Sequence, residues 1–558
     1  MPDNQDLVLS ISDFLSSEQK HREILEDTES WERIPWLNHR EIQPDGRLVR
    51  FTGMIQDMHD PEFFLESYNV KTETGQRIQN GIFYDLLQFN PETESVDLMS
   101  GEHKHGERRS LFVVTIPGLN SWAEEGNQEA VKLPEVEKLQ VSKRPEESSS
   151  ESVKRQKTSE STEPSQASSA CLSSEYLINS PLSDRPGRAC LVKIYKDFDK
   201  FRLNTVIDVI GFLSVHPSLD GSTEDVEEML SPEEHLVKNP PPSLIPRLHA
   251  VSVRESSIYL KEIFPEDDFQ EISRDILMLL TQCTFGDQLA GRYLFAHLLS
   301  SVQSRVGLEI LGKMCLNLSN IPGISSGYTK SLYTVLQELV PVSYRFEMTI
   351  ENLNEKQFTP KKDYKTGKLT SGILQLAPKT HLILDETHLD AGQLQSSGIE
   401  ALKSLGNLIR HQSIPADFQF YNLEYEMDVS VLILSEGKSL LPSDVLLPVK
   451  VDTAALEHIE ETIKAAQQFI KIRSTAIRNF LAAQKLAKFD LDEELQGVIQ
   501  EDLVSMRKAR NALPEELHSL LTLSRLVGKS LGKTRLDRET WDLVKKMDEE
   551  RRSRLQVK

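Results

Sequence analysis

Cysteine is scarce in this chain of 558 residues. The four cysteines are Cys171, Cys190, Cys283 and Cys315. None belongs to a C-x-x-C pair, and none lies near paired histidines, so the spacing excludes a disulfide scaffold and the common zinc patterns. We therefore expect free thiols in a reducing compartment.

Long apolar runs are also missing. No run approaches the roughly 20 residues that a membrane helix needs. The opening "MPDNQDLVLSISDFLSSEQK" lacks the basic start and apolar core of a secretory signal. We expect a soluble, intracellular protein with no membrane partner.

Positive charge is in short supply. The chain has 64 Lys and Arg against 86 Asp and Glu, a formal net charge of -22. A surface that follows nucleic acid phosphates needs clustered cations, so no strong direct nucleic-acid binding is expected. Aromatic residues near the N-terminus are interleaved with Asp and Glu, which favours core packing or protein contact over stacking on single strands. Examples are Phe51, Phe63, Phe64, Tyr68 and Phe83.

The apolar pattern divides the chain into seven parts. Short β-like segments flank a stretch with almost no apolar content, which predicts disorder. Strands and helices alternate after a Pro-rich linker, which predicts a mostly parallel α/β sheet. The predicted parts are a helical segment (1–40), a β-domain in two pieces (41–118 and 186–238) around a disordered Ser/Glu/Lys-rich insertion (119–185), the linker (239–247), an α/β domain (248–452) and a C-terminal helical domain (453–558).

The insertion contains two basic clusters separated by nine residues. They comprise Lys143 and Arg144, then Lys154, Arg155 and Lys157. Exposed, two-part basic segments suit nuclear import receptors, and we favour this interpretation over simple solvating charge. It predicts a nuclear protein.

Two Ser-Pro pairs lie in segments expected to be exposed. Ser180 precedes Pro181, and Ser231 precedes Pro232. Both serines are candidate phosphorylation sites for proline-directed kinases.

In the stretch "KTHLILDETHLDAG" (379–392), a run of apolar residues is followed directly by Asp385 and Glu386. This pattern is typical of a strand that places a Mg²⁺-linked Asp and a water-activating Glu, and it requires a phosphate loop G-x-x-x-x-G-K-[ST]. The one Gly-Lys-Ser, at 437–439, fails because Leu432 stands where the first Gly belongs.

The stretch "CTFGDQLAGRYLFAHLLSS" (283–301) is the better-placed candidate for the phosphate loop. If Gly286 is the first Gly, Gly291 is the second, and Arg292 and Tyr293 replace Lys and Ser/Thr. The hydroxyl that would coordinate Mg²⁺ is then absent, and a guanidinium is a poor substitute for a compact ammonium.

Several of these stretches resemble the MCM replicative helicases. "SGILQLAPKTHLILDETHLDAGQLQSSGIEALKSLGNLIRHQ" and "DVSVLILSEG" are similar to their acidic and sensor strands. "LVKIYKDFDKFRLNTVIDVIGFLSV" is similar to the end of their OB-fold, and "ELHSLLTLSRLVGKSLGKTRLDRETWDLVKKM" to their lid helices. The combination, with the acidic N-terminal region and Ser-rich insertion, resembles the MCM-binding protein family over essentially the full chain.

The resemblance implies a multidomain α/β and β fold. Its parts are an OB-like N-terminal β-domain with a disordered insertion, a degenerate AAA+ (MCM-like) α/β domain and a C-terminal helical lid-like bundle. Against the helicases, the departures fall on the ATPase groups: Arg292 and Tyr293, the region 435–436 in place of the sensor Asn, the arginine-free 440–451, and Glu515 in place of the lid Arg. Losing positioned positive charge should abolish phosphoryl transfer, so we expect no enzyme activity and no cofactor.

The family resemblance further implies a nuclear protein that binds MCM helicase subunits. It would regulate assembly, stability or unloading of the MCM complex in DNA replication and support sister-chromatid cohesion. Two alternatives remain, namely a partly active MCM-type ATPase and an OB-type module that binds single-stranded nucleic acid. His381 and His388 lie on either side of the acidic pair, and His411 lies some distance beyond. The sequence identifies no third ligand that would converge with the first two, so no metal site is expected.

Overall fold

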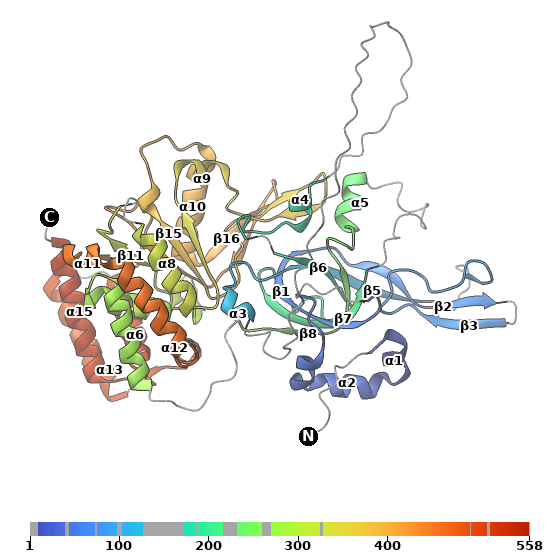
Figure 1. Cartoon of the computed structure of the whole chain (residues 1–558), viewed down its shortest axis with the longest axis horizontal. Helices are drawn as coiled ribbons and strands as arrows, with labels where there is room; N and C mark the ends of the chain where they lie inside the picture. Colours follow the sequence, from blue (N-terminus) through green and yellow to red (C-terminus); the bar gives the residue numbers. More distant parts are fainter. Residues whose placement is uncertain are drawn as a thin grey trace, which may run out of the picture.

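The structure is a computed structural model. It describes residues 9–38, 44–72, 75–96, 103–125, 172–185, 187–215, 231–258, 269–307, 309–323, 327–491, 493–510 and 514–556. A β-barrel lies on one side of the molecule, and a unit that combines a parallel sheet with many helices lies on the other (Figure 1). The described residues include no helix that is long and apolar enough to cross a membrane.

The barrel closes on itself through pairings of β1 with β7, β7 with β8, β8 with β6, β6 with β5 and β5 with β1. All are antiparallel except β6 with β8. Alternate residues such as Val49, Phe51 and Leu111 are buried in one interior core, as closed barrels require. The strands are β1 (Leu48–Met58), β5 (Lys104–Val114), β6 (Ala189–Ile194), β7 (Val206–Ser214) and β8 (Arg247–Glu255).

The predicted start of the α/β domain at residue 248 is wrong. Residues 247–255 form β8, which pairs with both β6 and β7 and so completes the barrel. The described chain next resumes at Phe269, the first residue of α6 in the α/β unit. The Pro-rich stretch at 239–246 therefore lies within the barrel domain, between α5 (Pro232–Lys238) and β8.

Two additions extend the barrel. A long hairpin of β2 (Glu62–Thr72) and β3 (Gly75–Asn80), joined by β4 (Ser95–Val96), projects away from the rest of the molecule (Figure 1). On the underside lie α1 (Ile11–Ser16), α2 (Glu18–Glu26) and the 3-10 helix η1 (Thr28–Arg33). Phe14 and Trp31 from these helices are buried in a core shared with Phe212 of β7.

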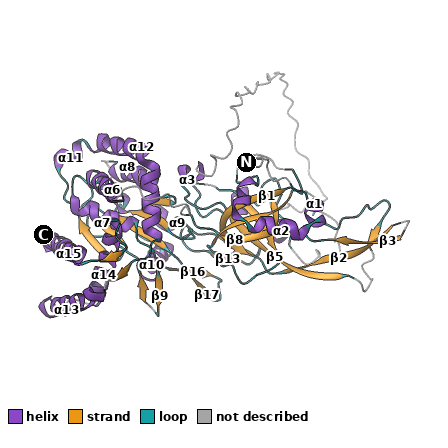
Figure 2. Ribbon diagram, turned by 90° about the horizontal axis from the view of Figure 1, so that it is seen from below, coloured by secondary structure: helices purple, strands orange, loops and turns teal. Residues whose placement is uncertain are grey.

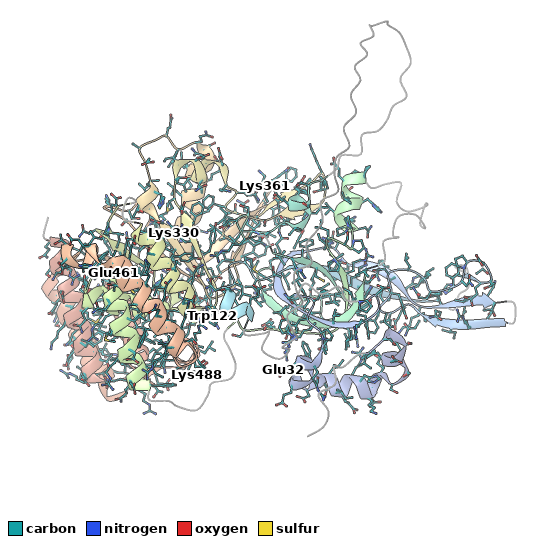
Figure 3. All side chains as sticks on the ribbon, viewed as in Figure 1. Glu32, Trp122, Lys330, Lys361, Glu461 and Lys488 are labelled. Atoms are coloured by element: carbon teal, nitrogen blue, oxygen red, sulfur yellow. The ribbon has the colours of Figure 1, made fainter. Side chains whose placement is uncertain are left out.

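Both ends of the predicted disordered insertion have a defined structure, so that prediction is wrong for 119–125 and 172–185. They contain α3 (Ser121–Glu125) and α4 (Ser174–Ile178). Trp122 of α3 donates a 2.8 Å hydrogen bond to the Gln337 carbonyl, and the guanidinium of Arg478 stacks on its indole at 3.8 Å (Trp122 is labelled in Figure 3). Residues 126–171, which hold the predicted import cluster, lie outside the described residues.

The α/β unit contains the parallel sheet predicted from the alternating pattern, in the order β12-β15-β18-β11-β19. Parallel strands are covered on both faces, which explains why every residue of β15 is buried. Ile383 faces one core, and Leu382 and Leu384 face the other. The strands are β11 (Leu316–Ser319), β12 (Ser343–Glu347), β15 (Thr380–Asp385), β18 (Val429–Leu434) and β19 (Val445–Pro448).

Helices α9 (Ile350–Glu355) and α10 (Ser396–His411) contribute to the core that contains Leu382 and Leu384. Helix α8 (Tyr328–Leu339) contributes to the core that contains Ile383. A second, four-stranded sheet, β14-β13-β16-β17, and a small hairpin lie beside them (Figure 2). Their strands are β13 (Lys361–Asp363), β14 (Lys368–Thr370), β16 (Ser413–Asp417) and β17 (Asn422–Glu426), and β9 (Ser304–Val306) with β10 (Glu309–Leu311).

The C-terminal helices share one core with the sheet instead of forming a separate domain. Trp541 and Ile477 belong to the same buried cluster as Ile383 and Leu432 of the sheet. Helices α6 (Phe269–Cys283) and α7 (Gln288–Leu298) pack against α12 and α14, which connects the start of the α/β unit to the end of the chain. The C-terminal elements are α11 (Thr453–Glu457), α12 (Ile459–Leu486), β20 (Asp490–Leu491), α13 (Glu493–Arg510), α14 (Pro514–Ser530), β21 (Arg535–Leu536) and α15 (Arg538–Gln556).

Buried hydrogen bonds join the barrel to the α/β unit at β14. The Gln56 side chain donates to the Leu369 carbonyl at 3.0 Å, and the Leu369 amide donates to Asp57 at 3.0 Å. Gln375 donates to the Gln56 carbonyl at 2.9 Å. Because these groups are buried, each unmade bond would cost desolvation energy, which fixes the two bodies against each other.

Candidate functional site

The acidic pair lies at the carboxyl edge of the parallel sheet. Asp385 is the last residue of β15, and Glu386 opens the 3-10 helix η4 (Glu386–His388); both side chains are buried. The register places Asp385 opposite Glu347 of β12 and Leu434 of β18. Open α/β sheets bind ligands at this edge, so the pair occupies the part of the fold where nucleotide chemistry is expected.

The charge of Asp385 is neutralised by Arg345 of β12. Arg345 donates from two nitrogens to Oδ2 of Asp385, at 3.0 and 2.7 Å. The Thr387 amide and hydroxyl donate to Oδ1 at 3.2 and 2.7 Å. Burial alone would raise the pKa of Asp385, but hydrogen bonds from Thr329, Thr387 and Arg345 outweigh it and lower the pKa. The carboxylate is therefore ionised, and a guanidinium lies where a bound cation would need access to it.

Glu386 is held by the loop that follows β18. Its Oε1 accepts hydrogen bonds from the Ser439 hydroxyl at 2.9 Å and from the Leu440 amide at 3.2 Å. Burial raises its pKa, and these two bonds only partly offset that effect. A general base must reach a water molecule and accept its proton. One oxygen of this carboxylate is already engaged by the protein.

The candidate phosphate loop at 283–301 does not have the required local structure. A phosphate loop joins a sheet strand to the start of a helix, so that helix N–H groups face the phosphates. Residues 284–287 instead join two helices, α6 and α7. The segment in the strand–loop–helix position runs from β11 to α8, with the sequence "LNLSNIPGISSGYTKS" at 316–331.

At the start of α8 the groups that would bind phosphate are replaced or displaced. Gly327 is the N-cap with φ +63°, and Tyr328 follows it where the loop motif has Lys. Tyr328 is buried and donates its hydroxyl to the Cys283 carbonyl at 2.9 Å. Thr329 is buried beside Arg345 and Asp385, whereas Lys330 is exposed (Lys330 is labelled in Figure 3). The Thr329 hydroxyl is therefore present at the carboxyl edge of the sheet, whereas the Lys330 side chain is not.

The residues proposed from sequence as loop remnants have packing roles. Gly291 lies where α7 crosses α6, and a Cβ there would approach the Thr281 hydroxyl to 2.6 Å. Gly286 has φ +77° in the turn between these helices. Tyr293 is fully buried in the main core, and Arg292 is partly exposed. Sequence reasoning missed the segment before α8 because Tyr328 and Thr329 separate Gly327 from Lys330 and break the motif.

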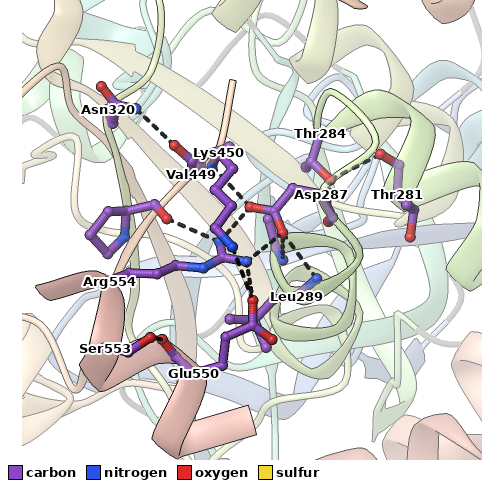
Figure 4. A network of polar contacts seen from close by, with 12 residues as sticks. Thr281, Thr284, Asp287, Leu289, Asn320, Val449, Lys450, Glu550, Ser553 and Arg554 are labelled. Atoms are coloured by element: carbon purple, nitrogen blue, oxygen red, sulfur yellow. Dashed lines mark hydrogen bonds and ion pairs between the residues drawn. The ribbon is translucent and has the colours of Figure 1, made fainter. Parts of the chain in front are cut away.

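A groove of about 660 Å³ lies between the α6–α7 turn and α15, and Gly286 and Arg292 line it. Figure 4 shows the polar network on its wall, centred on Asp287. Asp287 caps α7 through the Leu289 and Ala290 amides, accepts from the Lys450 amide at 3.0 Å and pairs with Arg554 at 2.5 and 3.0 Å. Because both carboxylate oxygens of Asp287 accept hydrogen bonds, the network fixes α15 against α7. Asp287 is therefore not available as a catalytic acid or base.

Of the other positions singled out from sequence, only His388 lies next to the acidic pair. Leu432 is buried in β18, and the Ser435 hydroxyl donates to Asn317 at 3.0 Å. His381 contacts Lys485 at 2.8 Å, whereas His388 lies 3.4 Å from Asp385. Among the described residues no cluster of three His, Cys, Asp or Glu has a metal-binding arrangement. The side chain of Glu515 and the five basic import residues lie outside what the structure describes.

The two candidate phosphorylation sites differ in accessibility. Ser231 is exposed and is the N-cap of α5, where its hydroxyl accepts from the Glu234 amide at 3.1 Å. Ser180 is half-buried next to the buried Pro181, and its hydroxyl donates to the Leu182 carbonyl at 3.3 Å.

The fold defines a multidomain protein of mixed α/β content, with a closed β-barrel joined to a parallel-sheet unit. Residues 21–555 match the sequence profile of the family described as "Mini-chromosome maintenance replisome factor". The chain belongs to this family.

Relatives across animals match over most of their length, and each is named "Mini-chromosome maintenance complex-binding protein". The Drosophila melanogaster protein is 40% identical, covering 96% of this chain and 94% of the relative. The Danio rerio protein is 35% identical, covering 95% and 92%. The Homo sapiens protein is 32% identical, covering 96% and 93%.

Proposed function

We propose that this chain binds subunits of the MCM complex without catalysing a reaction of its own. The first half of the proposal is supported by the name shared by relatives that are 32–40% identical over nearly the whole chain. The second half is supported by one observation above all. Arg345 donates two hydrogen bonds to Asp385, the carboxylate that would otherwise hold a metal-bound nucleotide.

We also propose that the two bodies are an OB-type domain and a degenerate AAA-type domain with a lid-like helical bundle. The OB-type assignment is supported by the closed barrel with a single parallel pairing, β6 with β8. The AAA-type assignment is supported by the parallel sheet, in which β11 leads through a glycine-capped loop to α8. A subunit-like shape of this kind explains how the protein recognises helicase subunits, because it offers the faces that subunits use with one another.

The role we propose is regulation of assembly, stability or unloading of the MCM complex during DNA replication, with consequences for sister-chromatid cohesion. A protein that binds one state of the subunits shifts their assembly equilibrium by mass action and needs no chemical energy. Nuclear location and a nuclear import receptor as a second partner are proposed from the basic residues between 143 and 157.

Two measurements on the purified full-length chain test the proposal. Co-elution with purified MCM subunits in size-exclusion chromatography is expected without added nucleotide. Phosphate release from ATP is expected to equal that of the Glu386→Gln variant, since both should be at background. Turnover that is lost in Glu386→Gln would support the ATPase alternative and contradict the proposal. Tight, salt-sensitive binding of single-stranded DNA by the chain would support the nucleic-acid alternative.

A further inference from the structure

Four aromatic side chains gather at the tips of two neighbouring hairpins of the second sheet. Tyr364 comes from the β13–β14 turn, and Phe418, Phe420 and Tyr421 come from the β16–β17 turn. Phe418 and Tyr421 stack with parallel rings 5.2 Å apart, and Tyr364 meets Phe420 edge-on at 6.0 Å. These four residues are called the aromatic tip below.

The aromatic tip is open to solvent. Phe420 is 85% exposed, Tyr421 55% and Tyr364 48%. Single exposed apolar residues are ordinary on protein surfaces, whereas contiguous exposed apolar patches are typical of interaction surfaces. Aromatic residues are enriched among the few side chains that supply most of the binding energy at protein interfaces.

The backbone beneath the aromatic tip is held in one arrangement. The Tyr364 hydroxyl donates to the Phe418 carbonyl at 2.8 Å, which joins the two turns. The Gln419 amide donates to Asp417 at 2.7 Å, and strands β16 and β17 pair along their whole length from Ser413 to Glu426. A preorganised surface loses less conformational entropy on binding, so these rings are suited to act as anchors.

The charges around the aromatic tip favour a protein partner over nucleic acid. At its base Lys361 lies 3.5 Å from Asp417, so those charges largely cancel. Strand β17 carries two exposed carboxylates, of which Glu426 lies 3.7 Å from Arg305 and Glu424 accepts a hydrogen bond from an amide, and Lys365 is a single exposed cation in the neighbouring turn. Stacking of nucleic-acid bases needs a continuous cationic track for the phosphates. The complementary partner therefore presents an apolar pocket with basic side chains along its rim.

We propose that the aromatic tip is a docking surface that inserts Phe420 and Tyr421 into an apolar, basic-rimmed pocket of a subunit of the MCM complex. The identity of the partner rests on the function proposed above. The contact chemistry rests on the exposure, stacking and local charge of these hairpins.

The test compares two pairs of exposed apolar residues on two hairpins. Phe420→Ser with Tyr421→Ser alters the aromatic tip, and Phe63→Ser with Ile78→Ser alters the β2–β3 hairpin, where the side chains are 81% and 78% exposed. Affinity of the full-length chain for purified MCM subunits is measured by biolayer interferometry. Sedimentation reports self-association, and thermal unfolding reports folding.

The first variant is expected to bind at least about tenfold more weakly, because hot-spot aromatic residues carry this much or more. The control variant is expected to bind like the wild type, and both should keep the wild-type melting temperature. Unchanged affinity in the first variant would overturn the docking proposal. Failure of the wild type to bind any subunit would instead overturn the proposed function. A change in sedimentation mass of the free protein in the first variant would assign the surface to a second copy and also overturn the proposal.

Discussion

Arg345 and Asp385 form an ion pair between neighbouring strands of the parallel sheet, with side chains only 8% and 0% exposed. The pair lies at the carboxyl edge, where open α/β sheets bind ligands. A guanidinium from the same chain thus supplies the positive charge that a nucleotide-bound cation would supply elsewhere. The Asp385 carboxylate thus has a cationic partner within the fold, which fits our proposal that the protein is not an enzyme.

Removing one partner of the Arg345–Asp385 pair should lower the stability of the protein. Arg345→Ala leaves the buried Asp385 without its cation, and we expect the free energy of unfolding to fall by about 3 kcal/mol. Urea unfolding followed by circular dichroism measures the change. Arg22→Ala is the control, because Arg22 and Glu18 form an exposed pair of the kind that contributes at most about 1 kcal/mol. Equal effects of the two substitutions would contradict the structural role of Arg345.

A buried lysine gives the protein a distinctive pH dependence. Lys485 donates to the Leu298 carbonyl at 3.3 Å, and its burial lowers its pKa to about 7. Between pH 7 and about 10.5 the unfolded chain binds this proton and the folded chain does not, so stability should rise with pH. Replacing Lys485 with Met should remove about 1.4 kcal/mol per pH unit from that slope.

The measurement is urea unfolding at several pH values across this window. The control is Lys471→Met, which changes an exposed lysine of the same helix, α12. An unchanged slope in Lys485→Met would mean that Lys485 keeps its proton in the folded protein at neutral and alkaline pH.

The serines of the two Ser-Pro pairs should be phosphorylated at different rates. Ser231 is exposed at the start of α5, where an added phosphate lies at the positive end of the helix dipole. Ser180 is half-buried, and its neighbour Asn179 is fixed by a 2.8 Å hydrogen bond to the Leu369 carbonyl. A proline-directed kinase should therefore modify Ser231 well before Ser180, as followed by mass spectrometry over time. Equal rates would mean that the segment around Ser180 opens readily.

The contact between the barrel and the α/β unit should couple their unfolding. Gln375 is fully buried and donates to the Gln56 carbonyl across the contact. Gln375→Ala leaves that carbonyl without this donor and should cost about 1–3 kcal/mol. We expect earlier cleavage between the two bodies in limited proteolysis. Gln76→Ala, on the exposed part of β3, is the control and should leave the digestion pattern unchanged.

Sequence patterns predicted the features that depend on local periodicity. The parallel sheet follows from alternating strands and helices, and the buried centre of β15 follows from its apolar residues at 382–384. Local periodicity does not predict which strands pair with one another. Residues 247–255 look like any short strand that follows a linker, and only pairing with β6 and β7 assigns them to the barrel.

The organisation of the candidate site depends on contacts between residues far apart in sequence. Arg345 precedes Asp385 by forty residues, and nothing in "SYRFE" marks this arginine as its partner. The phosphate-loop position was misjudged for a related reason. The prediction rests on the spacing of Gly286 and Gly291 and on the apolar helix that follows, whereas the strand-to-helix connection at this edge of the sheet ends in the glycine cap Gly327 of α8.

Non-catalytic binding to MCM subunits is tested most directly by the elution of the full-length chain mixed with purified MCM subunits on a size-exclusion column, with no nucleotide present. We expect a complex that elutes earlier than either component and that forms equally well with the Glu386→Gln variant. Separate elution of the chain and the subunits, or a complex that forms only with ATP and is lost in Glu386→Gln, would contradict it.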